Sequence, residues 1–163
     1  MCSNCKLDYI FYKMEEKLYQ ACSNGKVEKV QKLLQNSRVN INWQNQNDGY
    51  TPFYVACLFG RTEIVKLLLN DNRIDINKVD NDGQTPFYVA CRNEKTEVVK
   101  YLLESGREID INQKDNDGKT GLDYAKQKGN TDVVKLIESF QKNPNETRAQ
   151  LTKELVICKF FDC

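Results

Sequence analysis

The sequence predicts an all-α solenoid with short β-hairpin-like fingers, in which about four similar units stack in a row. Three observations predict this fold. The segment Thr51–Cys57 recurs verbatim as Thr85–Cys91, 34 residues later. Each copy precedes a second segment whose apolar residues lie three and four positions apart, which is the period of an α-helix. An Asp-Gly dipeptide, a strong turn signal, stands before each copy.

The first element is expected to be one long helix over about residues 8–23. Leu7, Met14 and Leu18 keep helical spacing in this region. Its last part, Glu16–Cys22, is a degenerate copy of the repeated segment in the same phase. A terminal unit is expected to differ from the others because it has a neighbour on only one side.

Two helices are expected in each following unit. Pro52 and Pro86 suit the first position of a helix, where the missing N–H costs nothing. A looser copy, Thr120–Lys126, starts the last unit. The second helix of each unit is expected to start at a threonine followed by an acidic residue, which favours a helix N-terminus. These threonines are Thr62, Thr96 and Thr131.

A finger is expected to connect each unit to the next. Residues 74–77 and 109–112 alternate apolar and polar side chains as Ile-Asp-Ile-Asn, which predicts a short extended segment. The turns that follow contain Gly49, Gly83 and Gly118, and glycine accepts a positive φ without steric cost.

Residues 142–163 are expected to form a C-terminal capping helix and tail. Pro144 and Glu146 fit the start of a helix, and Leu151 and Leu155 then lie on one face. The most apolar part, residues 156–161, allows two interpretations. It caps the last unit in the first interpretation, and it is a docking or dimer contact in the second.

This order of motifs resembles the ankyrin repeat, with its Gly-x-Thr-Pro start, its pair of small residues, its Val-Val-x-Leu-Leu helix and its Asp-x-Asn end. The resemblance covers about residues 14–141. It implies an ankyrin-repeat domain over residues 1–141, which includes an N-terminal helix extension. The expected repeats are at about 14–47, 48–81, 82–116 and 117–141.

One position departs from the family pattern. Tyr54, Tyr88 and Asp123 stand where the family usually has histidine. The hydrogen bond of that histidine is therefore not carried over to this chain. Either a tyrosine hydroxyl replaces it or the loop is held in another way.

Composition and charge argue against several classes of protein. The chain has 163 residues and a net charge of +1, so charge gives no case for binding nucleic acid or an anionic membrane. It has no apolar run long enough for a membrane-spanning helix. The segment Met1–Lys6 lacks the apolar core of a signal peptide. A cytoplasmic location is expected, with the nucleus as the alternative.

No catalytic residue, cofactor or metal ligand is predicted, and the chain is not expected to be an enzyme. It contains no histidine, which excludes Ser-His-Asp and Cys-His catalysis and every histidine-containing metal site. Cys22, Cys57 and Cys91 share one phase of the repeat and are expected to fill the core. The remaining cysteines are Cys2, Cys5, Cys158 and Cys163.

These four terminal cysteines support an alternative function, a metal- or redox-linked regulator. Cys2 and Cys5 have the spacing of half a zinc site. The two pairs of cysteines are expected beyond opposite ends of the stack, roughly 40 Å apart at ~10 Å per packed layer. A metal site within one molecule would therefore need one end to fold back.

The resemblance implies a non-catalytic protein–protein interaction module, such as an adaptor, an inhibitor or a sequestering protein. Ankyrin stacks bind on the concave side, which consists of finger tips and the exposed face of each first helix. Residues that differ between units on an otherwise fixed scaffold are the candidates. Leu58-Phe59 is apolar where the next unit has Arg92-Asn93, and Trp43 stands where the next finger has Lys78.

We therefore predict a binding hot spot built from Trp43, Tyr50, Leu58 and Phe59 and rimmed by Lys78 and Arg92. In the alternative interpretation, Trp43 folds onto its own finger and Phe59 packs against the neighbouring helix. The expected partner is a protein rather than nucleic acid or membrane. The chain is expected to be a monomer, with association through the C-terminal tail as the alternative.

Overall fold

In the computed structural model, the described residues are 3–161, and the described side chains are those of residues 12–157. Residues 3–161 form nine α-helices and no strand. The helices are α1 (Ser3–Ser23), α2 (Val27–Leu34), α3 (Pro52–Leu58), α4 (Thr62–Leu69), α5 (Pro86–Arg92), α6 (Thr96–Glu104), α7 (Gly121–Lys128), α8 (Thr131–Lys142) and α9 (Pro144–Phe161). The predicted all-α repeat solenoid is confirmed.

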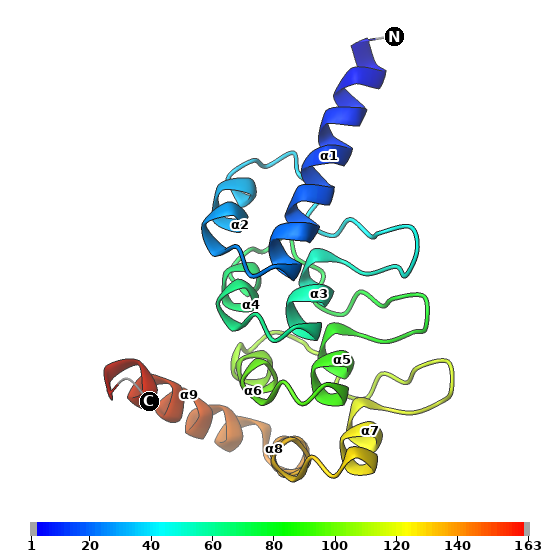
Figure 1. Cartoon of the computed structure of the whole chain (residues 1–163). Coiled ribbons are helices and arrows are strands. Elements are labelled where there is room, and N and C mark those ends of the chain that lie inside the picture. Colours follow the sequence, from blue (N-terminus) through cyan, green and yellow to red (C-terminus); the bar gives the residue numbers. More distant parts are fainter. Residues whose placement is uncertain (1–2, 162–163) are drawn as a thin grey trace.

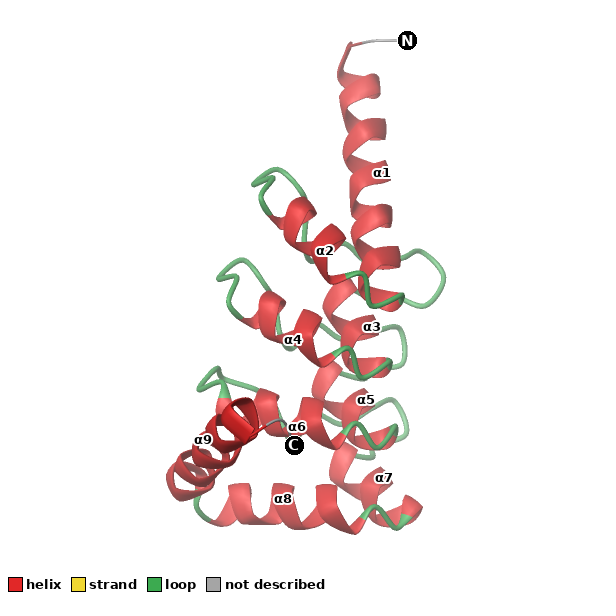
Figure 2. Ribbon diagram, turned by 60° about the vertical axis from the view of Figure 1, so that its left-hand side comes forward, coloured by secondary structure: helices red, strands yellow, loops and turns green. Residues whose placement is uncertain are grey.

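The helices form two parallel rows (Figure 1). Helices α1, α3, α5 and α7 stack on one another as an inner row, and α2, α4, α6 and α8 form the outer row. Three long connections extend from the inner row, away from the outer row. We call them finger 1 (residues 35–51), finger 2 (70–85) and finger 3 (105–120). Figure 2 shows the same stack from the side, with the first half of α1 projecting beyond it.

The inner helices begin as the sequence predicts. Thr51 is the N-cap of α3, and its hydroxyl accepts a hydrogen bond from the N–H of Tyr54, with Pro52 at the first helical position. Thr85 and Thr120 cap α5 and α7 in the same way. These caps satisfy N–H groups that the first turn of a helix leaves without a partner.

One helix start differs from the predictions, and the outer helices α4, α6 and α8 begin at the predicted threonines. Helix α1 begins at Ser3 rather than near residue 8, since the intervening residues contain no glycine or proline to end a helix. Thr62 and Thr96 are the first helical residues of α4 and α6, and the N-cap residues Arg61 and Lys95 make no side-chain cap.

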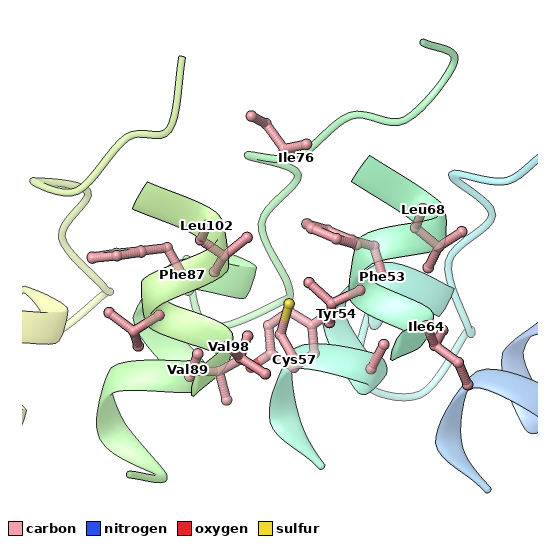
Figure 3. Packing of buried hydrophobic residues seen from close by; sticks show 14 of the residues in the cluster. Phe53, Tyr54, Cys57, Ile64, Leu68, Ile76, Phe87, Val89, Val98 and Leu102 are labelled. Atoms are coloured by element: carbon pink, nitrogen blue, oxygen red, sulfur yellow. The ribbon is translucent and has the colours of Figure 1, made fainter. Parts of the chain in front are cut away.

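The core lies between the two rows and continues from unit to unit (Figure 3). Phe53 and Cys57 of α3 are completely buried, and Phe87 occupies the place of Phe53 one unit further on. Cys22, Cys57 and Cys91 are all buried free thiols, as predicted from their shared phase. Each unit thus buries its apolar surface against its neighbours, and the core is as long as the stack.

The fingers are series of turns rather than extended segments. In finger 2, the N–H of Asn77 donates to Asp75 Oδ1 at 3.2 Å, which closes a side-chain turn. Ile74 and Ile76 are buried while Asp75 is exposed, so the apolar–polar alternation reflects this turn and not a strand. The one bridge between extended residues in the described chain joins Lys114 and Thr120.

Asparagine side chains connect successive fingers. Asn42 Nδ2 donates to the carbonyl oxygen of Arg73 at 2.8 Å, and Asn42 Oδ1 accepts from the N–H of Asp75 at 2.9 Å. Asn77 makes the same pair of bonds to Glu108 and Asp110 in finger 3. The amide supplies a donor and an acceptor at once, so each asparagine pairs two backbone groups of the next finger.

Finger tips approach one another closely at a glycine. Gly49 has a φ of 75°, and a Cβ atom there would lie 2.5 Å from Asn81 Oδ1 of finger 2. Gly118 has a similar φ, but a Cβ atom would have no neighbour within 4 Å because no finger follows it. Glycine is therefore needed in every finger because its φ is positive. Where another finger packs against the turn, glycine is also needed because a Cβ atom would not fit.

Arginines cap the C-terminal ends of the outer helices. Arg73 donates to the carbonyl oxygen of Leu34 in α2 at 3.1 Å, and Arg107 donates to that of Leu69 in α4 at 3.1 Å. Arg148, which lies in α9, donates to that of Leu103 in α6 at 3.2 Å. A cation at a helix C-terminus satisfies unpaired carbonyls and interacts favourably with the helix dipole.

Helix α9 packs against α6 and α8 at the end of the stack. Leu151 and Leu155 are buried, whereas Val156 and Ile157 are 44% and 53% exposed. Helix α9 therefore caps the stack up to Leu155, whereas Val156 and Ile157, the first residues of the segment with two interpretations, remain exposed. No helix within residues 3–161 is both long and apolar enough to cross a membrane.

We expect Arg107→Gln to lower the free energy of unfolding by ~2 kcal/mol. The substitution removes charge-assisted hydrogen bonds from the guanidinium to the carbonyl oxygens of Leu69 and Ile74. Chemical denaturation followed by circular dichroism measures the change. Arg38→Gln is the matched control, because Arg38 is an exposed arginine near the start of finger 1. Equal stability of the two variants would contradict the capping role of Arg107.

Candidate functional site

The candidate site is the surface formed by the finger tips and the exposed sides of the inner helices, which we call the concave face. It is hollowed between fingers 2 and 3, where a cavity of about 430 Å³ lies against α5 and α7. The cavity is lined by Asp82, Gln84, Arg92, Asp115, Asn116, Asp117, Tyr124 and Lys128. Because fingers and inner helices both line this cavity, its shape depends on how the fingers are held against the helices.

Tyrosine–aspartate hydrogen bonds fix that arrangement. Tyr54 of α3 donates its hydroxyl to Asp80 Oδ2 of finger 2 at 2.7 Å. The other carboxylate oxygen, Oδ1, accepts from the N–H groups of Asp82 and Gln84 and so closes the turn at the finger tip. Tyr54 and Asp80 are both buried. Of the two possibilities that the sequence left open at the position of the family's histidine, a tyrosine hydroxyl therefore makes the hydrogen bond here.

The same arrangement recurs one unit later. The hydroxyl of Tyr88 donates to Asp115 Oδ2, and Asp115 Oδ1 accepts from the N–H groups of Asp117 and Lys119. Burial and the neighbouring carboxylate both raise the pKa of Tyr88. Burial disfavours the ionised form of Asp115, but its hydrogen-bond donors, led by Tyr88, outweigh burial and lower the pKa of that carboxyl.

The end units replace the tyrosine–aspartate pair. In finger 1, Asn45 takes the place of the aspartate, and its Oδ1 accepts from the N–H of Tyr50 at 2.7 Å. In the last unit, Asp123 caps its own helix by accepting from the N–H of Thr120 at 2.9 Å. No finger follows α7, so Asp123 has no turn to hold.

Tyr50, Leu58 and Phe59 form the apolar part of the predicted hot spot. The Tyr50 ring stacks on Tyr54, with 4.4 Å between centroids and 15° between planes. Leu58 is half-buried and packs against the core, whereas Phe59 is 47% exposed. Phe59 thus keeps about half of its surface open to solvent, whether or not the rest packs against the neighbouring helix.

Trp43 lies against α1 rather than on its own finger. Its ring makes edge-to-face contacts with Tyr12 and Tyr19, at centroid distances of 5.8 and 5.9 Å. Trp43 is therefore half-buried, and Tyr12 remains 40% exposed beside it. The two tyrosines are seven positions apart, two helical turns, and that spacing was the signal in the sequence for a shared aromatic face.

Lys78 and Arg92 are the two charged residues of the predicted hot spot. Lys78 is half-buried in finger 2. Arg92 is exposed on α5, and its Nη1 donates to Gln84 Oε1 at 3.0 Å. Its guanidinium carbon lies 5.9 Å from the centroid of the Tyr124 ring, on the next inner helix. Gln84 and Tyr124 are thus positioning residues that the predicted hot spot did not include.

Charges of both signs surround the apolar residues. Burial raises the pKa of Tyr50, and the carboxylates of Asp48, Asp80 and Asp82 raise it further, while Arg92 lowers it. On the far side of the cavity, Lys119 Nζ lies 5.0 Å from the centroid of the Tyr124 ring. The concave face is therefore apolar at α3 and becomes polar toward α7, with carboxylates on the fingers and cations on the helices.

The described side chains, residues 12–157, include no group of three or more histidine, cysteine or acidic residues that could hold a metal ion. The four terminal cysteines, Cys2, Cys5, Cys158 and Cys163, fall outside these described side chains. Burial raises the pKa of the Cys22 thiol to about 12 and also raises the pKa values of Cys57 and Cys91. A thiol with a raised pKa is a poor nucleophile near neutral pH.

The chain matches the family model described as ankyrin repeats (3 copies). The match covers residues 18–115 and 72–148. No curated protein matches the chain.

We expect Tyr88→Phe to reduce the loss of stability in acid. A carboxyl whose pKa is lowered by folding stabilises the protein above its unfolded pKa, about 3.9, and this contribution is lost as the pH falls through the folded value. Removing the Tyr88 hydroxyl raises the pKa of Asp115 toward the unfolded value. The unfolding free energy at pH 7 minus that at pH 3 should therefore be smaller in the variant. Tyr12→Phe, at an exposed site, is the control, and an unchanged difference in Tyr88→Phe would contradict the assignment.

We also expect Cys22, Cys57 and Cys91 to resist alkylation in the native protein, since each thiol is buried. Iodoacetamide at pH 8, followed by peptide mapping, should label these three positions only after denaturation. Rapid native labelling of any of them would show that the core opens at that unit.

Proposed function

The chain belongs to the ankyrin-repeat family, and from this premise we propose that it is a non-catalytic module that binds a partner protein on its concave face. Ankyrin repeats are generally protein–protein interaction modules and are typically not catalytic. An adaptor, an inhibitor and a sequestering protein all fit this function. The proposed contact residues are Trp43, Tyr50, Leu58, Phe59, Lys78 and Arg92.

The exposure of Phe59 is the observation that carries this proposal. Contact of apolar surface with water is unfavourable. A partner that covers Phe59, which is 47% exposed, therefore gains binding free energy. The corresponding positions of the next two units carry Asn93 and Lys128, so α3 alone of these three inner helices presents an apolar side chain at this position. An aromatic side chain at the centre of a polar surface is typical of a binding hot spot.

The rest of the concave face supports a binding role. The fingers are held by buried tyrosine–aspartate bonds, so the surface is organised before a partner arrives, which reduces the entropy lost on binding. A stack of this size offers a face of about 800 Å², which is standard for one side of a protein complex.

We further propose that the protein acts as a cytoplasmic monomer. Three buried free thiols are compatible with a reducing compartment. The exposed side of α8 carries Asp132, Lys135 and Glu138, and α2 carries Glu28 and Lys29. Charged end helices give another copy little reason to continue the stack.

We expect the double substitution Leu58→Ser, Phe59→Asn to abolish or strongly weaken partner binding, because it removes the apolar surface of α3. Affinity capture from native lysate with mass spectrometry compares it with wild type. Val156→Ser, Ile157→Asn is the matched control, since it removes an exposed apolar pair on α9 instead. Thermal unfolding checks that each variant folds, and Phe59→Asn alone replaces the double variant if the change at half-buried Leu58 lowers stability.

A partner retained by wild type and by the α9 variant, but lost with the α3 variant, supports the proposal. A partner lost only with the α9 variant would move the site to the C-terminal helix. Partners retained by all variants would show that the concave face is not the binding site.

A further inference from the structure

Most arginines of this chain connect one unit to the preceding one. Of six arginines, four donate to carbonyl oxygens of the preceding unit. These are Arg61, Arg73, Arg107 and Arg148. Arg38 lies at the base of finger 1. Arg92 alone among them lies on an inner helix, so it is the guanidinium that the concave face presents.

Arg92 is oriented but not neutralised. Within the described side chains, its hydrogen bond goes to the neutral side chain of Gln84, and the Tyr124 ring lies beneath it. Among residues 12–157, no carboxylate oxygen lies within 4.0 Å of its guanidinium nitrogens, so Arg92 forms no ion pair there. A planar guanidinium held in this way keeps N–H donors free for a bidentate bond to a carboxylate.

The apolar shelf of Tyr50, Leu58 and Phe59 lies one unit away from Arg92. Gln84 and Arg92 occupy in their unit the places that Tyr50 and Leu58 occupy in the preceding one. Adjacent units are separated by ~10 Å, which equals about three residues of extended chain at ~3.3 Å each. A single extended strand of a partner can therefore reach both places.

Fingertip carboxylates are the competing feature. Asp82 and Asp117 line the cavity near Arg92, on the finger side. Arg92 and Lys128 lie on its helix side, and Lys119 adds a cation near Tyr124. Asp115 is already engaged by Tyr88 and by backbone N–H groups. An acidic side chain is favoured on the helix side, where the oriented guanidinium lies.

We propose that the partner segment is an extended, acidic one: an apolar side chain covers Leu58 and Phe59, and a carboxylate three or four residues away binds Arg92. This inference rests on the proposed concave-face function and adds the chemistry of the partner. Phe59 supplies most of the affinity, and Arg92 selects acidic segments over basic ones.

Selection of peptides on the whole protein tests this specificity. Random peptides of about 12 residues, long enough to cross about four units at ~3.3 Å per residue, are displayed on phage and selected on immobilised chain. Wild type should enrich peptides with Asp or Glu three or four positions from a large apolar residue. Arg92→Gln should weaken these peptides about tenfold, and Arg92→Glu should select Lys or Arg at the same position. Arg38→Gln, which removes the same charge away from the concave face, should change nothing.

Each other outcome overturns the inference in a distinguishable way. Basic residues enriched by wild type, or peptides that require Phe59 but are indifferent to Arg92→Gln, overturn the acidic specificity and leave the concave-face function standing. Peptides indifferent to both Phe59→Asn and Arg92→Gln overturn both proposals. A selection that enriches no peptide overturns the single extended segment, while the capture experiment decides the proposed function separately.

Discussion

The structure depends on one constraint: polar groups left without partners in one unit are satisfied by side chains of a neighbouring unit. Arg73 closes the C-terminal end of α2, and Asn42 pairs with the backbone of finger 2. Tyr54 donates to the aspartate that forms the next finger tip. Buried polar groups are costly when unpaired, so a single unit of this kind is not stable without a successor.

This dependence explains how the last unit ends. Helix α8 is followed by α9 rather than by a further finger, and the C-terminal residues take the missing roles. Arg148 of α9 binds the carbonyl oxygen of Leu103 as Arg107 binds that of Leu69 in the preceding unit. Gln141 of α8 donates to Asn112 Oδ1, the acceptor that a next finger would have used. Helix α9 thus closes the stack with the same chemistry that continues it elsewhere.

The same division of labour leaves the concave face free for recognition. Most repeated residues are engaged by packing and by contacts between units, which leaves some of the residues that differ between units available to a partner. Phe59 and Arg92 are the clearest cases, since one is exposed and the other is held only by a glutamine and an aromatic ring. A rigid scaffold with a few variable side chains can change its partner without changing its fold.

The sequence alone determined the repeat, the all-α class, the threonine caps with proline at the first helical position and the burial of the three in-phase cysteines, because these features repeat with the period of the unit. It also indicated Leu58-Phe59 as the odd apolar pair. Only the tertiary structure decided which side chains meet across units: that Tyr54 binds Asp80, that Trp43 lies on Tyr12 and Tyr19, and that Gln84 orients Arg92. These contacts, all but the last, join residues far apart in the chain, and periodicity describes the face on which a residue lies but not the neighbour that it will touch.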